Sequence, residues 1–291
     1  MILVTGANGQ LGRCFRQLAE NHPQWTFLAE GSDTLNISDN AAVEAYFSEN
    51  KPRWVVNCAA YTAVDKAESE PDKAELINVT GVEYLARACA RHGAGLIHFS
   101  TDYVYNGNQG TAFRETDPVA PAGVYARTKL AGEKAALQLL PGAIIIRTSW
   151  VYAREGNNFV NTMLRLGREL GRVRVVSDQI GTPTYAPDLA AAVLEIISQV
   201  ENGRKKPEEV AGTWNYSNEG VASWYDFAHA IFETAGIQAV AEPIESSEYP
   251  TPAKRPPFSV LNKSRIREQF GLHIPHWRDS LKACLLPEAH I

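Results

Sequence analysis

Short apolar runs alternate with longer amphipathic stretches over the first half of the chain. After each apolar run and a polar loop, apolar positions recur with the spacing of a helix face. The pattern predicts strands at 2–4, 26–28, 54–56, 96–99 and 143–147, and helices at 10–20, 39–49, 71–92 and 125–140. Continuous apolar runs are typical of parallel strands, because helices cover both faces of the sheet. We therefore expect an α/β fold with a Rossmann-type, doubly wound parallel sheet.

The alternation becomes irregular after about Trp150. Helices are predicted at 159–170, 188–199 and 224–235, between loops that contain Gly and Pro. The segment 242–257 holds five prolines, so we expect it to run over the surface and return toward the ligand cleft. The predicted organisation is a Rossmann domain at 1–150 and, at 151–291, mainly a smaller C-terminal substrate-binding lobe, with some segments returning to the first domain.

The composition is that of a globular protein, with 45% hydrophobic and 21% charged residues. A formal net charge of −5 argues against a nucleic-acid partner, which would favour a strongly basic face. Apolar runs stay short of the ~18 residues of a membrane span, and no basic leader precedes the first strand. The four cysteines are too far apart for a zinc site. We expect a cytoplasmic protein with reduced thiols, no bound metal and no membrane contact.

A glycine-rich loop follows the first predicted strand and opens the first predicted helix. Gly6, Gly9 and Gly12 have the spacing GxxGxxG. Glycines permit a tight turn and close approach of the backbone, and a helix N-terminus offers free N–H groups to a pyrophosphate. The pattern indicates a dinucleotide site, although a plain glycine-rich turn is the alternative.

The end of the second strand bears on the choice between NADH and NADPH. An acidic side chain there binds the ribose 2′-OH, whereas a basic one favours a 2′-phosphate. The sequence offers Glu30 and Asp33 for the hydroxyl and Ser32 for a phosphate. Either NADPH or NADH therefore remains open as the cofactor.

Tyr125 and Lys129 form a YxxxK pair at the start of a predicted helix. A spacing of four residues puts both side chains on one face, where we expect the ammonium to lower the pKa of the phenol and make it useful for proton transfer. The spacing alone is common by chance. Thr101 and Asp102, however, directly follow the fourth strand, at the sheet edge where doubly wound folds bind ligands, so the Thr101 hydroxyl is placed to bond the same carbonyl oxygen. Singly, each of the two also suits an ordinary turn.

Together with these residues, eight motifs resemble the extended short-chain dehydrogenase/reductases, and within them the dTDP-4-dehydrorhamnose reductase family, over nearly the whole length. The motifs are GANGQLG at 6–12, NCAAYTAVDKAE at 57–68, STDYVY at 100–105, YARTKLAGE at 125–133, RTSWVY at 147–152, NNFVNTML at 157–164, DQIGTPT at 178–184 and RPPFSVLN at 255–262.

The resemblance implies an NAD(P)H-dependent reductase that transfers hydride to C4 of dTDP-4-keto-L-rhamnose and gives dTDP-L-rhamnose. Tyr125 would donate the proton, Lys129 would bind the nicotinamide ribose, and Thr101 would orient the carbonyl. The residues implied along the cofactor are Gly6, Gly9, Gln10, Leu11, Gly12, Asn36, Ile37, Ala60, Tyr61, Thr62, Tyr125 and Lys129. Those implied at the nucleotide-sugar substrate are Thr101, Asp102, Trp150, Asn161, Gln179 and Arg255.

Arg255 is our choice for the diphosphate, because neighbouring prolines restrict its backbone and a guanidinium can form two parallel hydrogen bonds. An ordinary surface arginine is the alternative.

Two departures from the family pattern matter. Asn36 stands where relatives often carry Asp, and the helix at 13–19 lacks the carboxylates with which some relatives pair through magnesium. We therefore expect a monomer or a weak homodimer.

Two other functions are compatible with the fold. A nucleotide-sugar 4,6-dehydratase or epimerase is one, but dehydratases carry a glutamate base where this chain has Tyr103. A non-catalytic dinucleotide-binding subunit, like the regulatory subunit of methionine adenosyltransferase, is the other. Retention of Thr, Tyr and Lys together favours catalysis.

His98 is expected to be a core residue without chemistry, and Trp224 to belong to the core of the second lobe.

Overall fold

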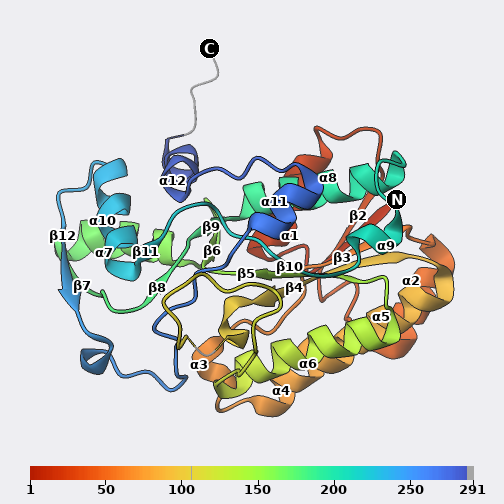
Figure 1. Cartoon of the computed structure of the whole chain (residues 1–291), viewed down its shortest axis with the longest axis horizontal. Coiled ribbons are helices and arrows are strands. Elements are labelled where there is room, and N and C mark those ends of the chain that lie inside the picture. The colour runs from red at the N-terminus through yellow and green to blue at the C-terminus, as the bar shows by residue number, and fades with distance from the viewer. Residues whose placement is uncertain (106, 287–291) are drawn as a thin grey trace.

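The computed structural model describes residues 1–105 and 107–286. A parallel six-stranded sheet forms its centre (Figure 1). Its strands follow the order β2-β1-β3-β4-β5-β10. Its strands are β1 (Ile2–Thr5), β2 (Phe27–Glu30), β3 (Trp54–Asn57), β4 (Gly95–Thr101), β5 (Ile144–Thr148) and β10 (Gly212–Asn215). Five of them match the predicted apolar runs, with β2 starting and ending slightly later. The sixth, β10, was not predicted, because four residues in the irregular half of the sequence carry little pattern.

Helices cover both faces of this sheet, which confirms the doubly wound α/β fold. One face carries α2 (Asn40–Asn50), α5 (Gly81–His92) and α6 (Gly123–Leu139), and the other carries α1 (Gln10–Ala19), α8 (Ala186–Glu201) and α11 (Ser264–Phe270). Successive residues of each strand point alternately into the apolar cores on the two faces of the sheet. Val4 and Val56 face α1 and α8, whereas Leu3 and Val55 face α2 and α5.

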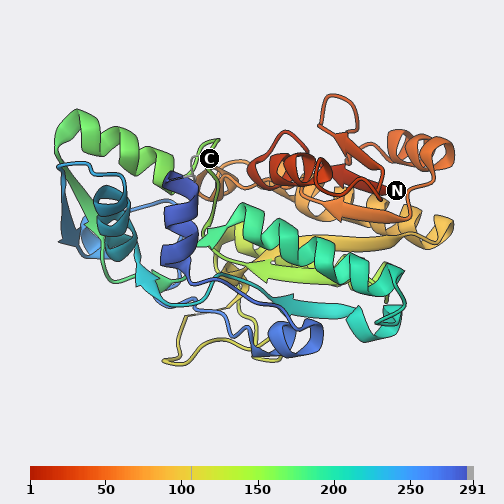
Figure 2. The same cartoon turned by 90° about the horizontal axis from the view of Figure 1, so that it is seen from above.

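A smaller lobe lies beside the carboxyl ends of the strands (Figure 2). Its own apolar core joins α7 (Phe159–Leu170), α10 (Trp224–Thr234) and α12 (Trp277–Leu285) to a parallel pair, β7 (Arg172–Val176) and β12 (Val240–Ile244). Strand β12 overlaps the start of the segment 242–257 that we expected to be surface loop. The proline at 243 is tolerated because β12 pairs with β7 alone and is an edge strand.

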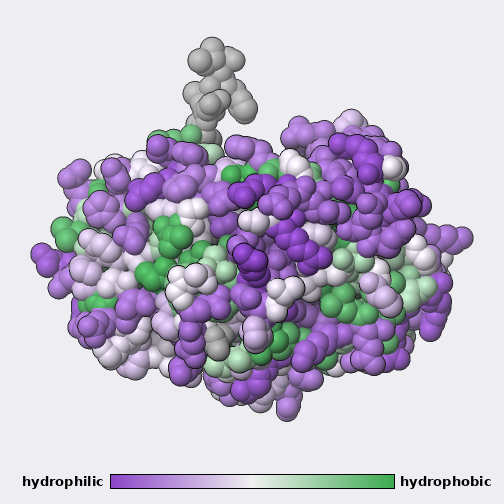
Figure 3. Space-filling view, in the orientation of Figure 1, coloured by the Kyte–Doolittle hydropathy of each residue, from purple (hydrophilic) through white to green (hydrophobic). Residues whose placement is uncertain are grey.

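Short elements complete the chain. They are the strands β6 (Val151–Tyr152), β8 (Ile180–Gly181), β9 (Thr184–Tyr185) and β11 (Ala222–Ser223), the helices α3 (Val64–Ala67), α4 (Pro71–Glu75) and α9 (Pro207–Val210), and 3-10 turns at Asp102–Val104 and Ser246–Glu248. On the face in Figure 3, hydrophilic residues dominate and apolar ones form small separate patches.

The helical stretch predicted over 71–92 contains one π-helical turn, Leu76–Thr80, between α4 and α5. Asn78 lies in this turn and is fully buried. Its side chain bonds both the backbone N–H and the backbone C=O of Tyr61 and also donates to the Thr128 hydroxyl. The turn therefore ties the loop after β3 to α6.

A buried ion pair joins α6 to the sheet. The Arg147 guanidinium on β5 donates to Glu133 on α6 from Nε, at 3.0 and 3.2 Å to the two carboxylate oxygens, and from Nη2 at 2.7 Å. Ser100 on β4 donates to the same carboxylate, and Tyr105 accepts from Arg147 Nη1 at 2.8 Å. Both charged side chains are less than one-tenth exposed. The pair is fully hydrogen-bonded, which burial of two charges requires.

We expect Glu133→Ala to lower the free energy of unfolding by about 3–5 kcal/mol, because it leaves the guanidinium buried and unpaired. Urea denaturation followed by circular dichroism measures the loss. Glu169→Ala is the control: it breaks the exposed pair with Arg165 (2.8 Å), and such pairs contribute less than ~1 kcal/mol. Equal losses in the two variants would contradict the structural role of Glu133.

Candidate active site

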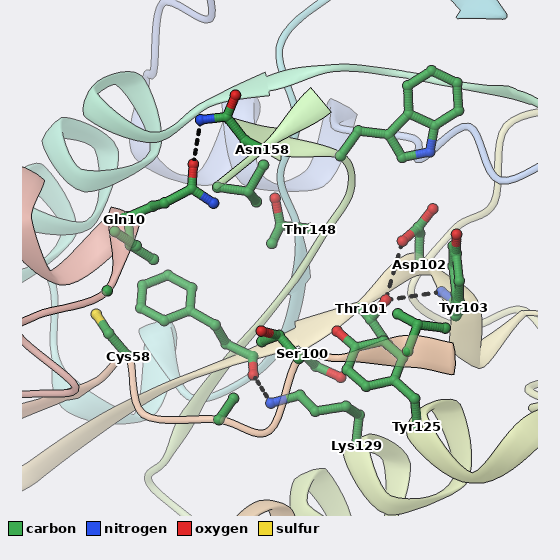
Figure 4. Close-up of a pocket in the computed structure, with 18 of the residues that line it drawn as sticks. Gln10, Cys58, Ser100, Thr101, Asp102, Tyr103, Tyr125, Lys129, Thr148 and Asn158 are labelled. Carbon is green, nitrogen blue, oxygen red and sulfur yellow. Dashed lines mark hydrogen bonds between the residues drawn. The ribbon is translucent and has the colours of Figure 1, made fainter. Parts of the chain in front are cut away.

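A cavity of about 440 Å³ opens at the carboxyl ends of the strands, between the sheet and the smaller lobe. Its wall combines the loop after β1, the loop after β3, the end of β4, the start of α6 and the segment after β5 (Figure 4). Strands β1 and β3 are neighbours in the sheet, and β1 connects first to β2 on its other side. This is a topological switch point, where doubly wound sheets bind ligands.

The glycine loop has the geometry that a dinucleotide needs. Gly6 has φ 64°, and a Cβ there would lie 2.6 Å from the Ala59 backbone nitrogen. A Cβ on Gly12 would lie 2.4 Å from the Gly6 carbonyl oxygen. Helix α1 starts after Gly9 with no side-chain cap, so its first N–H groups are free for an anion. Gly9, Gln10 and Leu11 line the cavity, and Gly6 and Gly12 shape the loop behind them.

The other residues expected along the cofactor divide into two groups. Ala60 and Thr62 line the cavity. Tyr61 does not: its hydroxyl donates to Glu70 at 2.8 Å. Asn36 and Ile37 also lie outside this lining. The Asn36 side chain accepts the Ser38 backbone N–H in a local turn, and Ile37 is buried.

Thr101, Tyr125 and Lys129 meet at the cavity, as the sequence predicted. Figure 4 shows both α6 side chains extending toward the end of β4. Burial raises the pKa of Tyr125 to about 12, and a side-chain hydrogen bond with Thr101 lowers it by a smaller amount. The sequence-based expectation that Lys129 lowers this pKa was wrong for the present state, because desolvation dominates. The phenol is therefore protonated at neutral pH.

The Lys129 amine is buried beneath this phenol. Its Nζ donates to the Phe99 carbonyl oxygen at 2.6 Å and lies 3.5 Å from His98 Nε2. Burial lowers the pKa of Lys129 to about 8, while Glu133 acts in the opposite direction. Lys129 is thus mostly charged at pH 7 and loses its charge as the pH rises through about 8.

Asp102 is a buried carboxyl group on the cavity wall. Its Oδ1 accepts from the Thr101 hydroxyl at 3.1 Å, and Oδ2 has no hydrogen-bond partner among the described residues. Burial raises its pKa from 3.8 to about 7, although the nearby Ser259 and Thr101 hydroxyls oppose the shift. An oxygen without a partner in a cavity is a point where a polar ligand can bind.

Trp150 and Trp224 form an aromatic pair across the two lobes. Their ring centroids are 3.5 Å apart at an interplanar angle of 9°, and both line the cavity. Trp150 has φ 47°, a left-handed backbone conformation that bulky residues rarely adopt. Trp224 was expected in the core of the lobe, and no sequence signal separates it from the core aromatics around it. It packs against that core but also faces the cavity.

The three substrate residues predicted further along the chain lie outside this cavity. Asn161 donates to the carbonyl oxygens of its own loop, and Gln179 donates to Ser246 at 2.9 Å. Arg255 lines a neighbouring cavity of about 340 Å³, which shares Tyr103 with the first. Its guanidinium forms two hydrogen bonds with Asp65, at 3.0 and 2.8 Å. Asp65 had not been singled out, because only the folded chain brings α3 to the proline-rich segment.

The four cysteines are free thiols. In the described part of the chain, no three His, Cys, Asp or Glu side chains gather as metal ligands would. None of the helices described there is both long enough and apolar enough to cross a membrane.

This fold and this cavity define a Rossmann-type α/β protein with the hydroxyl, phenol and amine set of the short-chain dehydrogenases/reductases. Within that class, the chain belongs to the RmlD substrate binding domain family, whose model matches residues 1–289. It is 41% identical to the dTDP-4-dehydrorhamnose reductase of Aggregatibacter actinomycetemcomitans, with 97% of each chain covered.

Two solved structures have the same fold over 98% of both chains. The dTDP-4-dehydrorhamnose reductase from Clostridium acetobutylicum superposes with a TM-score of 0.91 at 40% identity. The enzyme of the same name from Bacillus anthracis, solved in complex with NADP, superposes with a TM-score of 0.92 at 36% identity.

We expect Asp102→Asn to change the pH dependence of stability. The folded-state pKa of Asp102 lies above the unfolded value, so ionisation favours the unfolded chain, and stability is lost as pH rises from about 4 to about 7. The variant should therefore gain in Tm relative to the wild type over this window. Asp117→Asn should instead be less stable than the wild type by a nearly constant amount over this window, since a backbone hydrogen bond from Arg114 lowers the pKa of Asp117 below 3.8 and its stabilisation is lost only at lower pH. A pH-independent difference between Asp102→Asn and wild type would show that the carboxyl is not held neutral by burial.

Proposed function

We propose that this chain is an NAD(P)H-dependent reductase that converts the C4 keto group of dTDP-4-dehydro-L-rhamnose to the alcohol of dTDP-L-rhamnose. The convergence of Thr101, Tyr125 and Lys129 on a cavity that also contains the glycine loop carries this proposal. The names of the relatives support the substrate, and NADP in the Bacillus anthracis relative supports the cofactor.

The dinucleotide fits the loop and the amine. The uncapped start of α1 after Gly9 suits the pyrophosphate, and Lys129 suits the nicotinamide ribose. The bound cofactor supplies the hydride. Glu30 already accepts from the Tyr46 hydroxyl at 2.8 Å, whereas Ser32 and Asp33 are exposed. No single acid or base dominates this strand end, so we propose that both NADPH and NADH bind.

Tyr125 serves as the proton donor in this scheme. A pKa of about 12 keeps the phenol protonated before reduction, which is the form that can give a proton to the developing alkoxide. The Thr101 hydroxyl donates to Asp102 Oδ1 at 3.1 Å and would turn to donate to the same substrate oxygen. Asp102 and the Trp150–Trp224 pair line the same cavity, and we propose that they contact the sugar.

The dehydratase alternative lacks a base. Tyr103 stands where a glutamate would act, and burial raises its phenol pKa well above 10. Its ring meets that of Tyr125 edge-on, with centroids 6.1 Å apart, so it supports the proton donor by packing. A non-catalytic dinucleotide-binding subunit would not need Thr101 and Lys129 to meet in this cavity, so their convergence favours an enzyme.

Residues 151–291 supply mainly the substrate-binding lobe, while β10 and α8 return to the central sheet.

Four free thiols support a reducing, cytoplasmic location. Helix α1 carries no carboxylate, which supports a monomer or a weak homodimer rather than a metal-linked one.

Oxidation of NADPH and of NADH in the presence of dTDP-4-dehydro-L-rhamnose, followed at 340 nm, is the direct test, and we expect turnover with both. Tyr125→Phe should lose about 10²–10⁴-fold in kcat, because only the proton donor is removed. It should keep the cofactor-induced rise in Tm, since the ring remains. Near-normal turnover of Tyr125→Phe would contradict the role of the phenol, and cofactor binding without wild-type turnover would favour a non-catalytic subunit.

Arg255→Ala should chiefly raise KM for the sugar nucleotide, by about tenfold or more, because the diphosphate does not react and its binding is uniform between ground and transition states. Asp65→Asn is the matched control. It removes the charge that holds the guanidinium at 2.8 Å, so a diphosphate ligand becomes easier to engage and KM stays level or falls. A rise in KM in both variants would instead identify the pair as a tether for the segment, and a fall in kcat alone for Arg255→Ala would exclude the diphosphate role.

A further inference from the structure

His98 links a row of buried polar side chains to the catalytic amine. Its Nδ1 lies 3.0 Å from Asn57 Nδ2, and its Nε2 lies 3.5 Å from Lys129 Nζ. The imidazole is fully buried on β4, and Asn57 and Lys129 are at most 3% exposed. The roles assigned above do not use this imidazole.

The orientation of Asn57 decides which nitrogen of His98 carries the proton. Asn57 Oδ1 accepts the Ala59 backbone N–H at 3.1 Å and the Thr5 hydroxyl at 2.7 Å. A backbone N–H can only donate, so the amide oxygen must face Ala59 and the amide NH₂ must face His98. His98 Nδ1 is then an acceptor. Burial and the nearby Lys129 lower the pKa of His98 well below 6.5, so the ring is neutral and its one proton is on Nε2.

The Nε2–H group of His98 is therefore directed toward Lys129 Nζ. An ammonium has donors alone, whereas a neutral amine has a lone pair that can accept this N–H. The Phe99 carbonyl oxygen, 2.6 Å from Nζ, accepts from either form. Hence the two forms of Lys129 differ in what they gain from His98.

We propose that His98 is a positioning residue, which Asn57 locks as the Nε2–H tautomer so that it stabilises the neutral amine of Lys129 and sets the alkaline limit of the reaction. The part that concerns activity rests on the proposed function, and on the ammonium being the form of Lys129 that binds the nicotinamide ribose. Activity then falls as pH rises through the Lys129 pKa of about 8.

Asp102, on the wall of the same cavity, has a pKa of about 7 and is therefore ionised before Lys129 loses its charge. The other titratable groups around Lys129 do not change charge near pH 8. Tyr125, on the same helix, has a pKa of about 12, and the pKa of the Cys58 thiol after β3 is well above 9 because of burial. Glu133 lies one turn further along α6, where Arg147 binds it, and it favours the ammonium. His98 and Glu133 thus act on Lys129 in opposite directions.

The tautomer can be measured without any activity. In ¹⁵N-labelled, cofactor-free protein, long-range ¹H–¹⁵N spectra distinguish a protonated ring nitrogen from an unprotonated one, and the signals of His98 are assigned by their loss in His98→Leu. We expect Nε2 protonated and Nδ1 unprotonated from about pH 6 to about pH 9, with no change of tautomer. A proton on Nδ1, or a doubly protonated ring in this range, would overturn the inference whatever the substrate of the enzyme.

Asn57→Asp reverses the tautomer in a nearly isosteric side chain, because a carboxyl oxygen then faces Nδ1 and accepts its proton. His98 Nε2 becomes an acceptor for the ammonium, and the alkaline limit of kcat/KM should move up by about one pH unit or more. His98→Leu removes the N–H donor without adding a charge, and its limit should also rise. Thr5→Val perturbs the same row but leaves Ala59 to orient the amide, so its limit should stay at the wild-type pH.

The outcomes separate the two proposals. If the alkaline limit of kcat/KM rises in Asn57→Asp but not in His98→Leu, the added charge acts directly on Lys129. That result would overturn the role of His98. The role of His98 would also be overturned if the spectrum of Asn57→Asp shows the reversed tautomer but its alkaline limit of kcat/KM stays at the wild-type pH. If His98→Leu does not fold, as judged by its Tm, His98→Gln takes its place in assigning the signals, and the spectrum and pH profile of Asn57→Asp decide. Absence of wild-type turnover with the 4-keto sugar nucleotide would reject the proposed function and leave the tautomer result standing.

Discussion

The buried ion pair between Glu133 and Arg147 fixes the geometry on which the site depends. Tyr125, Lys129 and Glu133 follow one another at intervals of four residues, so they share one face of α6. Glu133 binds Arg147 on β5 and Ser100 on β4. These contacts set the rotation of α6 about its axis and its position along that axis relative to the strand ends. The phenol and the amine then reach the cavity where β4 ends. A fully hydrogen-bonded pair can do this in the interior because each partner satisfies the other.

The cleft is spanned by contacts that a ligand has to accommodate. Gln10 on α1 accepts from Asn158 at the start of α7, at 2.7 Å, and the two stacked tryptophans join the end of β5 to α10. Asp65 and Arg255 hold the proline-rich segment against α3. Each contact connects the central sheet, or the helices on it, to a part of the chain that follows residue 150. These contacts join the parts of the chain on either side of residue 150 around the cavity.

Burial gives the site an unusual set of protonation states. Desolvation keeps the phenol of Tyr125 protonated, raises the pKa of Asp102 to about 7 and lowers that of Lys129 to about 8. In each case the less charged form is favoured, since the polar groups nearby are mainly neutral donors and acceptors. Such a site has protons to give near neutral pH, and it avoids the cost of several fixed charges in one small volume.

The sequence by itself determined the α/β class, five of the six central strands, the glycine loop, and the meeting of Thr101 with Tyr125 and Lys129. Each of these depends on local spacing: strand runs, a loop between strand and helix, and a helical interval of four residues. Tertiary structure decided what depends on contacts between distant segments. It added β10 to the sheet, turned Trp224 toward the cavity, paired Arg255 with Asp65 across 190 positions, and placed His98 between Asn57 and Lys129. It also decided the proton states, because desolvation depends on everything packed around a group, and no sequence interval records that.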